Sequence, residues 1–529
     1  MPMVENPLVR NCEPECSEPV EAIVKGNIPE WLNGTLLRNG PGLREIGGKK
    51  LQHMFDGLSV LHQYEIENGR VRYRNRYLRS EAYTRNMSAK RVVISEFGTR
   101  ALPDPCRSLF KRYMSYFSMG KLSDNAAVSI YPIGDKLYAS TESPRIWEID
   151  PKSLDSIERL DMTDYVVVNT YSAHPHIERD GVIYNMGSNF VGKGSYKIIK
   201  TIPKSSSTGM MEVSVVCSIP VRHPLSPSYY HSFSMTEDYI IFVEQALCIA
   251  LPTLVKNYMS GKTFSSSMRW KPNFKNRFIV VEKRSGKIIS TKYYSEPFVY
   301  LHTINAYQED GHIVCDICCY DDGQALQYLF GEKIIDVIEK MRSGMVADTL
   351  YGKCLRSRAK RFVIPLETAM EKRRGNLVQL KSTSATAIAV GKKILLTPEY
   401  LSPESMPLVE MAQINYAHYN GRKYRYFYCV TRNNKFNFQL GKVDTLDKTA
   451  IIWKEKDHFI SEPIFVPKPN ATSEDDGVIL AAAVSELEEN KGFLVFLDGK
   501  SFEELARAEF TTSSPLVNDF HGIFWSKTG

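Results

Sequence analysis

The chain has 529 residues, of which 43% are hydrophobic and 24% charged, a composition typical of a folded globular protein and not of a disordered one. The formal net charge of +7 is small for this length. It favours loose attraction to anionic membrane surfaces over dedicated nucleic-acid binding, for which a dense basic stripe would be expected. The ten cysteines are irregularly spaced, which indicates reduced thiols in an intracellular protein.

The N-terminal segment is predicted to be neither an export signal nor an anchor. Residues 1–21 lack an apolar stretch and include five glutamates, which argues against a secretory signal and gives no support to an arginine-rich transit peptide.

The longest apolar run, 239–255, is interrupted by Glu244, Gln245 and Pro252, so we expect no transmembrane helix. We predict a flexible N-terminus over 1–17 and a single domain over 18–529.

Short strands are predicted along most of the chain. Apolar and polar residues alternate from 55–57 through 71–74 and 92–95, resume after 126, and dominate again from 362 onward, which predicts strands. These strands follow one another at intervals of about ten residues with Gly, Asn or Asp between them, a pattern typical of a sandwich, a barrel or a propeller.

Three segments break the strand pattern. At 332–345 an apolar stripe at helical spacing predicts a helix that is inserted over the sheets. At 106–121 apolar residues recur at helical spacing among basic ones, which fits either a helix packed on the core or an amphipathic patch on a membrane. The apolar and basic segment 246–262 is a second candidate for association with a membrane surface.

Three predicted hairpins carry a histidine at the open end, six to eight residues before an acidic turn. The pairs of histidine and turn are His174 with Asp180-Gly181, His231 with Asp238, and His302 with Asp310-Gly311. A fourth histidine, His521, lies in a predicted last strand. The spacings of 57 and 71 residues between the first three suit blades of roughly 40–70 residues with insertions. Four imidazoles so far apart in the chain could converge only in a radially repeating fold.

Four neutral imidazoles suit iron, copper or zinc, and on an octahedral iron they leave two positions open for dioxygen or substrate. A metal-bound imidazole usually donates its other N–H to a carboxylate or a carbonyl. Three glutamates are predicted where they could accept it: Glu142, Glu410 and Glu462. A single histidine or glutamate is more often an ordinary structural residue, so the recurrence carries the hypothesis. His176 alternates with His174 along the strand and should face away.

Other catalytic chemistries lack their motifs. The chain has no Gly-x-Ser-x-Gly elbow, no His-Glu-x-x-His and no phosphate-binding loop that ends in Gly-Lys-Ser/Thr. This leaves the histidine-bearing hairpins as the main candidate site.

A set of motifs at these positions resembles the carotenoid cleavage oxygenases and spans the chain nearly end to end. The motifs are LLRNGPG at 36–42, FDG at 55–57, SEFGT at 95–99, PDPC at 103–106, TE at 141–142, AHPH at 173–176, YHSF at 230–233, HTIN at 302–305, QINY at 413–416, SEP at 461–463 and FHG at 520–522.

The resemblance implies an all-β fold, a seven-bladed β-propeller with a helical dome and a ferrous ion, Fe(2+), on its axis. It implies that His174, His231, His302 and His521 are the metal ligands and that Glu142, Glu410 and Glu462 orient them. It also implies that Phe97, Thr141 and Phe520 lie near the substrate cavity.

Within the family, segments 229–245, 280–284 and 293–295 look most like the animal enzymes that cleave carotenoids eccentrically. The resemblance therefore implies an Fe(II)-dependent dioxygenase that splits a C=C bond of a carotenoid or xanthophyll, at the 9′,10′ position, into apocarotenal products. Three alternatives stay open: central 15,15′ cleavage giving retinal, a retinoid isomerohydrolase, and a non-catalytic carotenoid-binding propeller.

The resemblance also implies partners and a location. The expected partners are a carotenoid or xanthophyll, O2 and a membrane surface contacted by 106–121 and 246–262, with no nucleic acid and no obligate protein partner. We expect a mitochondrial or cytoplasmic, peripherally membrane-associated protein, although the transit segment of mitochondrial relatives is not evident in the sequence.

Overall fold

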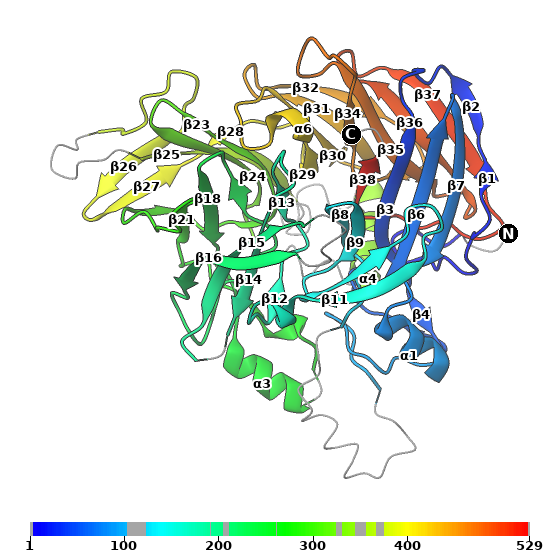
Figure 1. Ribbon diagram of the computed structural model, residues 1–529, viewed down its shortest axis with the longest axis horizontal. Coiled ribbons are helices and arrows are strands. Elements are labelled where there is room, and N and C mark those ends of the chain that lie inside the picture. The colour runs from blue at the N-terminus through cyan, green and yellow to red at the C-terminus, as the bar shows by residue number, and fades with distance from the viewer. Residues whose placement is uncertain are drawn as a thin grey trace.

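The computed structural model describes residues 4–102, 123–190, 192–204, 211–260, 262–323, 331–343, 356–366 and 375–526. The predicted surface segment 106–121 lies outside these residues. Within them, seven sheets of four to six strands follow one another around the centre of the molecule (Figure 1). The predicted all-β fold, a seven-bladed propeller, is confirmed.

The first three blades come from the N-terminal part of the chain, and one of them also takes the last strand. In order of pairing, the first consists of β1 (Val20–Glu21), β7 (Arg70–Tyr77), β6 (Leu58–Glu67), β3 (Gly34–Leu43) and β38 (His521–Trp525). The second consists of β11 (Ser156–Asp161), β10 (Arg145–Ile149), β9 (Lys136–Ser140) and β8 (Ser129–Ile133). The third consists of β12 (Thr170–Tyr171), β14 (Ile183–Asn189), β15 (Ser195–Ile202) and β16 (Glu212–Pro220), with β13 (His176–Ile177) also on β14.

The fourth and fifth blades come from the middle of the chain. The fourth consists of β17 (Ser234–Met235), β18 (Tyr239–Glu244), β21 (Asn276–Glu282), β22 (Lys292–Ser295), β27 (Lys393–Thr397) and β26 (Thr386–Val390). The fifth consists of β23 (Val299–Glu309), β24 (His312–Tyr320), β25 (Ser357–Pro365) and β28 (Glu399–Tyr400).

The last two blades complete the wheel. The sixth consists of β29 (Glu410–Gln413), β30 (Tyr426–Arg432), β31 (Phe438–Asp444) and β32 (Thr449–Lys454). The seventh consists of β2 (Ile23–Gly26), β37 (Glu504–Thr511), β36 (Lys491–Asp498), β35 (Gly477–Ser485) and β33 (His458–Ile460), with β34 (Ile464–Pro467) also on β35. Two short pairs, β4 (Glu45–Ile46) with β5 (Lys49–Lys50) and β19 (Leu247–Ile249) with β20 (Met268–Trp270), lie outside the blades.

The wheel is closed by strands from the two ends of the chain. Strand β38 pairs with β3 from Thr35↔Trp525 to Asn39↔His521, and Figure 1 shows the two side by side. At the same time β2 is the outer strand of the seventh blade, paired with β37. Arg38 lies fully buried on β3, and its guanidinium donates to Asp519 and Glu462. The pairing of β38 with β3 and the pairing of β2 with β37 must both form before the blades enclose a common axis.

The helices are few. They are α1 (Glu81–Ala89), α3 (Leu251–Ser260), α4 (Gly331–Arg342) and the short α6 (Tyr416–Tyr419), together with the 3-10 turns η1 (Met162–Asp164) and η2 (Ser265–Ser267). The predicted helix at 332–345 is confirmed as α4, whose Ile334, Val337 and Ile338 are buried in the core. None of the helices within the described ranges is long and apolar enough to span a bilayer.

Helix α1 lies in a region of the chain for which the sequence pattern predicts strands. The sequence pattern predicts a strand at 92–95, but this prediction is wrong: the residues there are irregular, and the helix precedes them. The Ser80 hydroxyl caps the helix by accepting from the Tyr83 N–H at 3.1 Å. The Asp124 carboxylate, far along the chain, accepts from the backbone N–H groups of Glu81 and Ala82. Long-range capping of this kind leaves no local sequence pattern.

The described part of the N-terminal segment, residues 4–17, packs on the propeller. Arg10 is buried, and its guanidinium donates to the carbonyl oxygens of Ser485, Glu489 and Leu516. Cys12 is also fully buried. The segment that the sequence predicts to be flexible therefore lies against residues close to the seventh blade.

Candidate metal centre

The four predicted histidines meet at the centre of the wheel. One ring nitrogen from each of His174, His231, His302 and His521 lies within 4.8 Å of those of the others. The Nε2 atoms of His174 and His231 are 2.9 Å apart. His176 stays outside this group, and its ring contacts Asn420 and the Phe233 carbonyl.

Each member of the site comes from a different blade. His174 lies between β12 and β13, His231 just before β17, His302 within β23 and His521 at the start of β38. Glu142 lies after β9, Glu410 at the start of β29 and Glu462 between β33 and β34. The seven predicted residues thus come from all seven blades, one from each. A propeller gives every blade one strand near the axis, so convergence follows from the fold.

The three glutamates contact three of the histidines on the side away from the centre. Glu142 Oε1 lies 2.6 Å from His231 Nδ1, Glu410 Oε2 lies 2.5 Å from His302 Nδ1, and Glu462 Oε1 lies 2.8 Å from His521 Nδ1. An ionised carboxylate only accepts, so each Nδ1 is the donor. The lone pair of each Nε2 therefore faces the centre. Among the residues that the structure describes, none presents a carboxylate to His174.

Burial favours the neutral form of two histidines of the cluster, because it lowers their pKa values. The pKa of His174 lies well below its usual value because the ring is buried and because the other three imidazoles surround it. Burial also lowers the pKa of His521, although Glu462 opposes this shift. Burial alone would raise the pKa of Glu462, but His521 and Arg38 beside it bring the pKa below the usual value. Glu462 is thus an ionised acceptor at neutral pH.

The donor set fits a transition-metal ion. His302 Nε2 is buried and has no hydrogen-bond partner among the described residues. The lone pairs of His231, His302 and His521 directed at one point repel one another, and a cation between them removes that repulsion. Neutral nitrogen donors suit iron, copper and zinc, whereas calcium and magnesium prefer oxygen.

A cavity of about 1950 Å³ opens beside the histidines, and its lining includes His231, His302 and His521. This volume exceeds the roughly 300–1,000 Å³ of ordinary ligand pockets and suits a long molecule. Phe97, Thr141 and Phe520, which the resemblance places near the cavity, all line it.

Further aromatic residues in the wall were not found from the sequence. Phe55 packs edge-to-face on Phe520 with ring centroids 5.7 Å apart, and Phe264 packs on Phe97 at 5.8 Å. His53 contacts Phe55 and Phe97 at 4.7 and 4.9 Å, so it holds the wall although it has no repeated context in the sequence. Of Phe55, Phe264 and His53, only Phe55 belongs to a motif that the sequence analysis singles out, FDG.

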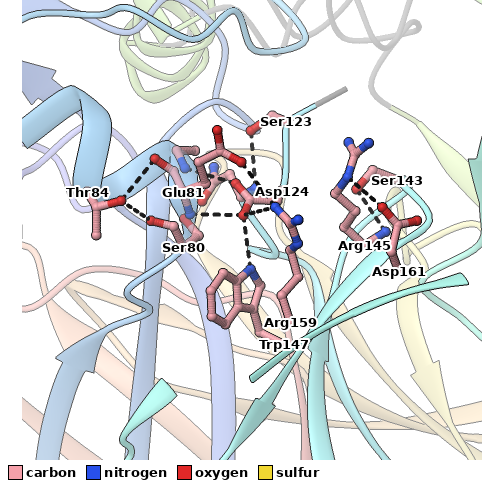
Figure 2. A network of polar contacts seen from close by, with 12 residues as sticks. Ser80, Glu81, Thr84, Ser123, Asp124, Ser143, Arg145, Trp147, Arg159 and Asp161 are labelled. Carbon is pink, nitrogen blue, oxygen red and sulfur yellow. Dashed lines mark hydrogen bonds and ion pairs between the residues drawn. The ribbon is translucent and has the colours of Figure 1, made fainter. Parts of the chain in front are cut away.

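One side of the cavity is polar. Figure 2 shows Asp124 at the middle of a network in which it accepts from Trp147 Nε1 at 3.2 Å and lies close to Arg159. Arg145 in the same view pairs with Asp161 at 3.0 Å. Asp124 and Arg145 belong to the lining. Isolated charged residues in a sequence give no sign of such a network.

Helices α1, α3 and α4 all contribute residues to the cavity wall. On α3, Val255 and Met259 line the cavity and are also 59% and 51% exposed. The predicted surface segment 246–262 therefore combines an apolar exposed face with a place at the cavity wall.

Comparisons with known proteins agree with this geometry. The family model described as "Retinal pigment epithelial membrane protein" matches residues 9–526. The mitochondrial carotenoid-cleaving dioxygenase of Mustela putorius furo is 40% identical over 526 residues, which cover 98% of this chain and 96% of that protein. The β,β-carotene 15,15′-dioxygenase of Mus musculus is 39% identical over 520 residues, which cover 96% of this chain and 89% of that protein.

Among solved structures, a mutant of the Synechocystis apocarotenoid oxygenase has a TM-score of 0.76 at 21% identity, with 98% of both chains covered. Its cobalt-substituted form has a TM-score of 0.74. This likeness shows the fold, whereas the match over residues 9–526 and the animal relatives show the family. The chain therefore belongs to the family of the retinal pigment epithelial membrane protein, the carotenoid cleavage oxygenases, as its motifs predicted.

Proposed function

We propose that the protein is an iron-dependent dioxygenase that splits one C=C bond of a carotenoid or xanthophyll into two carbonyl products. The observation that carries the proposal is a cluster of four buried imidazoles beside a cavity large enough for a polyene. A bound ferrous ion would supply the redox chemistry that activates dioxygen, and the four nitrogen donors would hold that ion beside the cavity.

The protein's own residues would bind the ion and the polyene, orient them, and exclude water from the site. His174, His231, His302 and His521 would hold the ion. The carboxylates of Glu142, Glu410 and Glu462 would keep the proton on each Nδ1, so that Nε2 stays a donor to the metal. We assign Phe97, Thr141 and Phe520 to contact with the polyene, because their side chains line the cavity.

The position of cleavage is proposed to be the 9′,10′ bond. Segments 229–245, 280–284 and 293–295 favour the eccentric enzymes, but the Mus musculus relative named for 15,15′ cleavage is nearly as similar as the carotenoid-cleaving dioxygenase of Mustela putorius furo. Central cleavage is therefore the second candidate. The two differ in how far the polyene slides past the histidines before one double bond reaches them.

The direct test is product analysis. Purified protein loaded with Fe(II) is incubated with β-carotene or zeaxanthin under O2, and the chain lengths of the aldehydes are determined. Eccentric cleavage gives two aldehydes or ketones of unequal length, whereas central cleavage gives retinal from β-carotene. Isomerised retinol from all-trans-retinyl ester without O2 would instead indicate a hydrolase.

Paired histidine variants separate an enzyme from a carotenoid carrier. We expect His174→Ala to abolish aldehyde formation and His176→Ala to retain it, because only the first ring lies in the cluster. Retained pigment with no aldehyde from the wild-type protein, and pigment binding indifferent to His174→Ala, would identify a non-catalytic binding protein.

We also propose that the protein lies on a membrane surface, in mitochondria or the cytoplasm. A polyene substrate is insoluble in water and is held in bilayers, and the exposed apolar face of α3 belongs to the cavity wall. Two of the relatives, from Mustela putorius furo and Homo sapiens, are named as mitochondrial proteins.

A further inference from the structure

Strand β29 contains a geometric conflict. Glu410 and Gln413 are three residues apart, and residues three apart on a regular strand point to opposite faces of the sheet. Both nevertheless support the histidine cluster. Glu410 Oε2 accepts from His302 Nδ1, and Gln413 Nε2 donates at 2.7 Å to Glu462 Oε1. The same Glu462 oxygen accepts from His521 Nδ1.

A β-bulge resolves the conflict. Glu410 pairs with Val430 and Gln413 pairs with Tyr428 on β30. Two residues of β29, Met411 and Ala412, therefore stand opposite one residue of β30. The extra residue shifts the alternation of side chains by one position, so that Glu410 and Gln413 face the same side.

Met411 is the residue that makes the bulge possible. Its φ of +51° lies in the left-handed region, where glycine is at ease and other residues are strained. The turn frees the Met411 N–H from the ladder, and this group donates at 3.2 Å to Glu410 Oε2, the oxygen that faces His302. Left-handed non-glycine residues concentrate at functional sites, where the surroundings hold them in place.

The facing strand is irregular in the same way. The pairing of β23 with β24 shifts register between Tyr300 and Thr303, the interval that contains His302, and again between Thr303 and Asn305. The His302–Glu410 pair is therefore built from two strands that both leave the regular ladder at the contact.

We propose that the left-handed bulge at Met411 is a positioning device of the metal centre and that Gln413 is a further positioning residue. One short strand thereby orients two ligands from different blades, His302 through Glu410 and His521 through Gln413 and Glu462. The inference rests on the proposed metal site, and it assigns the geometry of that site to the backbone conformation of a residue that is not itself a ligand.

The test is metal affinity, measured by calorimetric titration of the apo-protein with Co(II) and, anaerobically, with Fe(II). The wild-type protein and His302→Ala are titrated first. The metal site is established if the wild type binds one equivalent of metal ion and His302→Ala binds none. Absence of binding by the wild type would contradict the proposed function itself, separately from this inference.

Four variants then decide the inference. Met411→Gly accepts the left-handed backbone, so we expect an affinity within about threefold of the wild type. Met411→Val resists that backbone, and Gln413→Leu removes the donor to Glu462; we expect each to weaken binding by about 10–100-fold, the range found for outer partners of metal ligands. Asn68→Val is the matched control, because Asn68 has a φ of +50° in an exposed turn.

The melting temperature of each apo-protein reports folding separately from metal binding. The inference holds if Met411→Val loses affinity while Met411→Gly and Asn68→Val keep it. It is overturned if Met411→Val binds as the wild type does, or if Met411→Gly is as weak as Met411→Val, since the side chain and not the backbone would then matter. Wild-type affinity in Gln413→Leu would remove Gln413 from the site.

Discussion

The three glutamates around the histidines differ in how firmly the protein holds them. The Glu142 side chain is 33% exposed, that of Glu410 10% and that of Glu462 1%. Glu142 accepts from Tyr229 as well as from His231, while Glu462 also pairs with buried Arg38 and accepts from Gln413. Loss of the Glu462 charge therefore disturbs a larger buried network.

We expect this difference to appear in matched substitutions. Glu142→Gln should weaken metal binding by about 10–100-fold, because the amide holds the imidazole tautomer less firmly. Glu462→Gln should weaken it at least as much and should also lower the free energy of unfolding by about 3–5 kcal/mol, because a buried ion pair loses one partner. Calorimetric titration and thermal unfolding measure the two effects, and equal stability of both variants would contradict the argument.

Asp56 is a buried carboxylate that follows Phe55 of the cavity wall. It accepts from the His53 and Gly98 N–H groups and from the Thr99 hydroxyl, which ties the loop of Phe55 to the loop of Phe97. Burial raises the pKa of Asp56 to about 6, although these donors and Arg44 oppose the shift. The folded protein therefore holds a proton there in a pH range in which the unfolded chain has released it.

The sign of the pH effect follows from that proton. Between about pH 4 and pH 6 the native state binds more protons at Asp56 than the unfolded state, so stability falls as the pH rises, by about 3 kcal/mol in total. We expect the melting temperature of the wild type to fall relative to that of Asp56→Asn across this range and to run parallel above it. Parallel curves from pH 4 to pH 7 would show that the pKa of Asp56 is not raised.

At the scale of elements, helix α3 offers an apolar face to solvent. We expect the double substitution Val255→Ser and Met259→Ser to lower partitioning onto vesicles of phosphatidylcholine and phosphatidylserine by about 30-fold or more, because each side chain buried in a bilayer contributes about 1–3 kcal/mol. Metal content should not change, since neither residue contacts the histidines.

The matched control lies on edge strand β26. Ile388 and Val390 are 45% and 58% exposed, close to the exposures of Met259 and Val255, and they lie away from the cavity lining. Serine at both positions should leave vesicle binding unchanged. A similar loss from both pairs would mean that exposed apolar area in general, and not α3, determines association.

Elements were predictable from the sequence wherever local patterns decide them. Turn residues such as Asp310-Gly311, both at positive φ, marked the hairpins, and the distance of each histidine from its turn gave its level along the axis. The apolar stripe of α4 was equally visible. Helix α1 was missed because a carboxylate 43 residues beyond Glu81 caps it, and period-two reasoning fails at bulges such as that of Met411.

At the scale of the whole molecule, the site depends on closure of the wheel. Gly522 follows His521 on β38, and a Cβ atom there would lie 2.2 Å from the Leu37 carbonyl oxygen on β3. The motif FHG thus needs glycine for the close approach of two backbones, a requirement that the sequence alone does not reveal.

We expect Gly522→Ala to spread β38 from β3, to lower the free energy of unfolding by about 1–3 kcal/mol and to weaken metal binding, because His521 moves with the strand. Ser526→Ala, just beyond the end of the same strand, serves as the control and should change neither quantity. Thermal unfolding and metal titration check both. If Gly522→Ala bound the metal as tightly as the wild type, the metal site would not depend on the close pairing of β38 with β3.

Placing the fourth imidazole at residue 521 also has a consequence for biosynthesis. While a ribosome is still making the chain, the first three histidines can be present without the strand that completes their ring. Capture of an ion by all four would therefore have to wait until β38 has been made and has paired with β3, and a chain without this strand would offer only three of the four ligands.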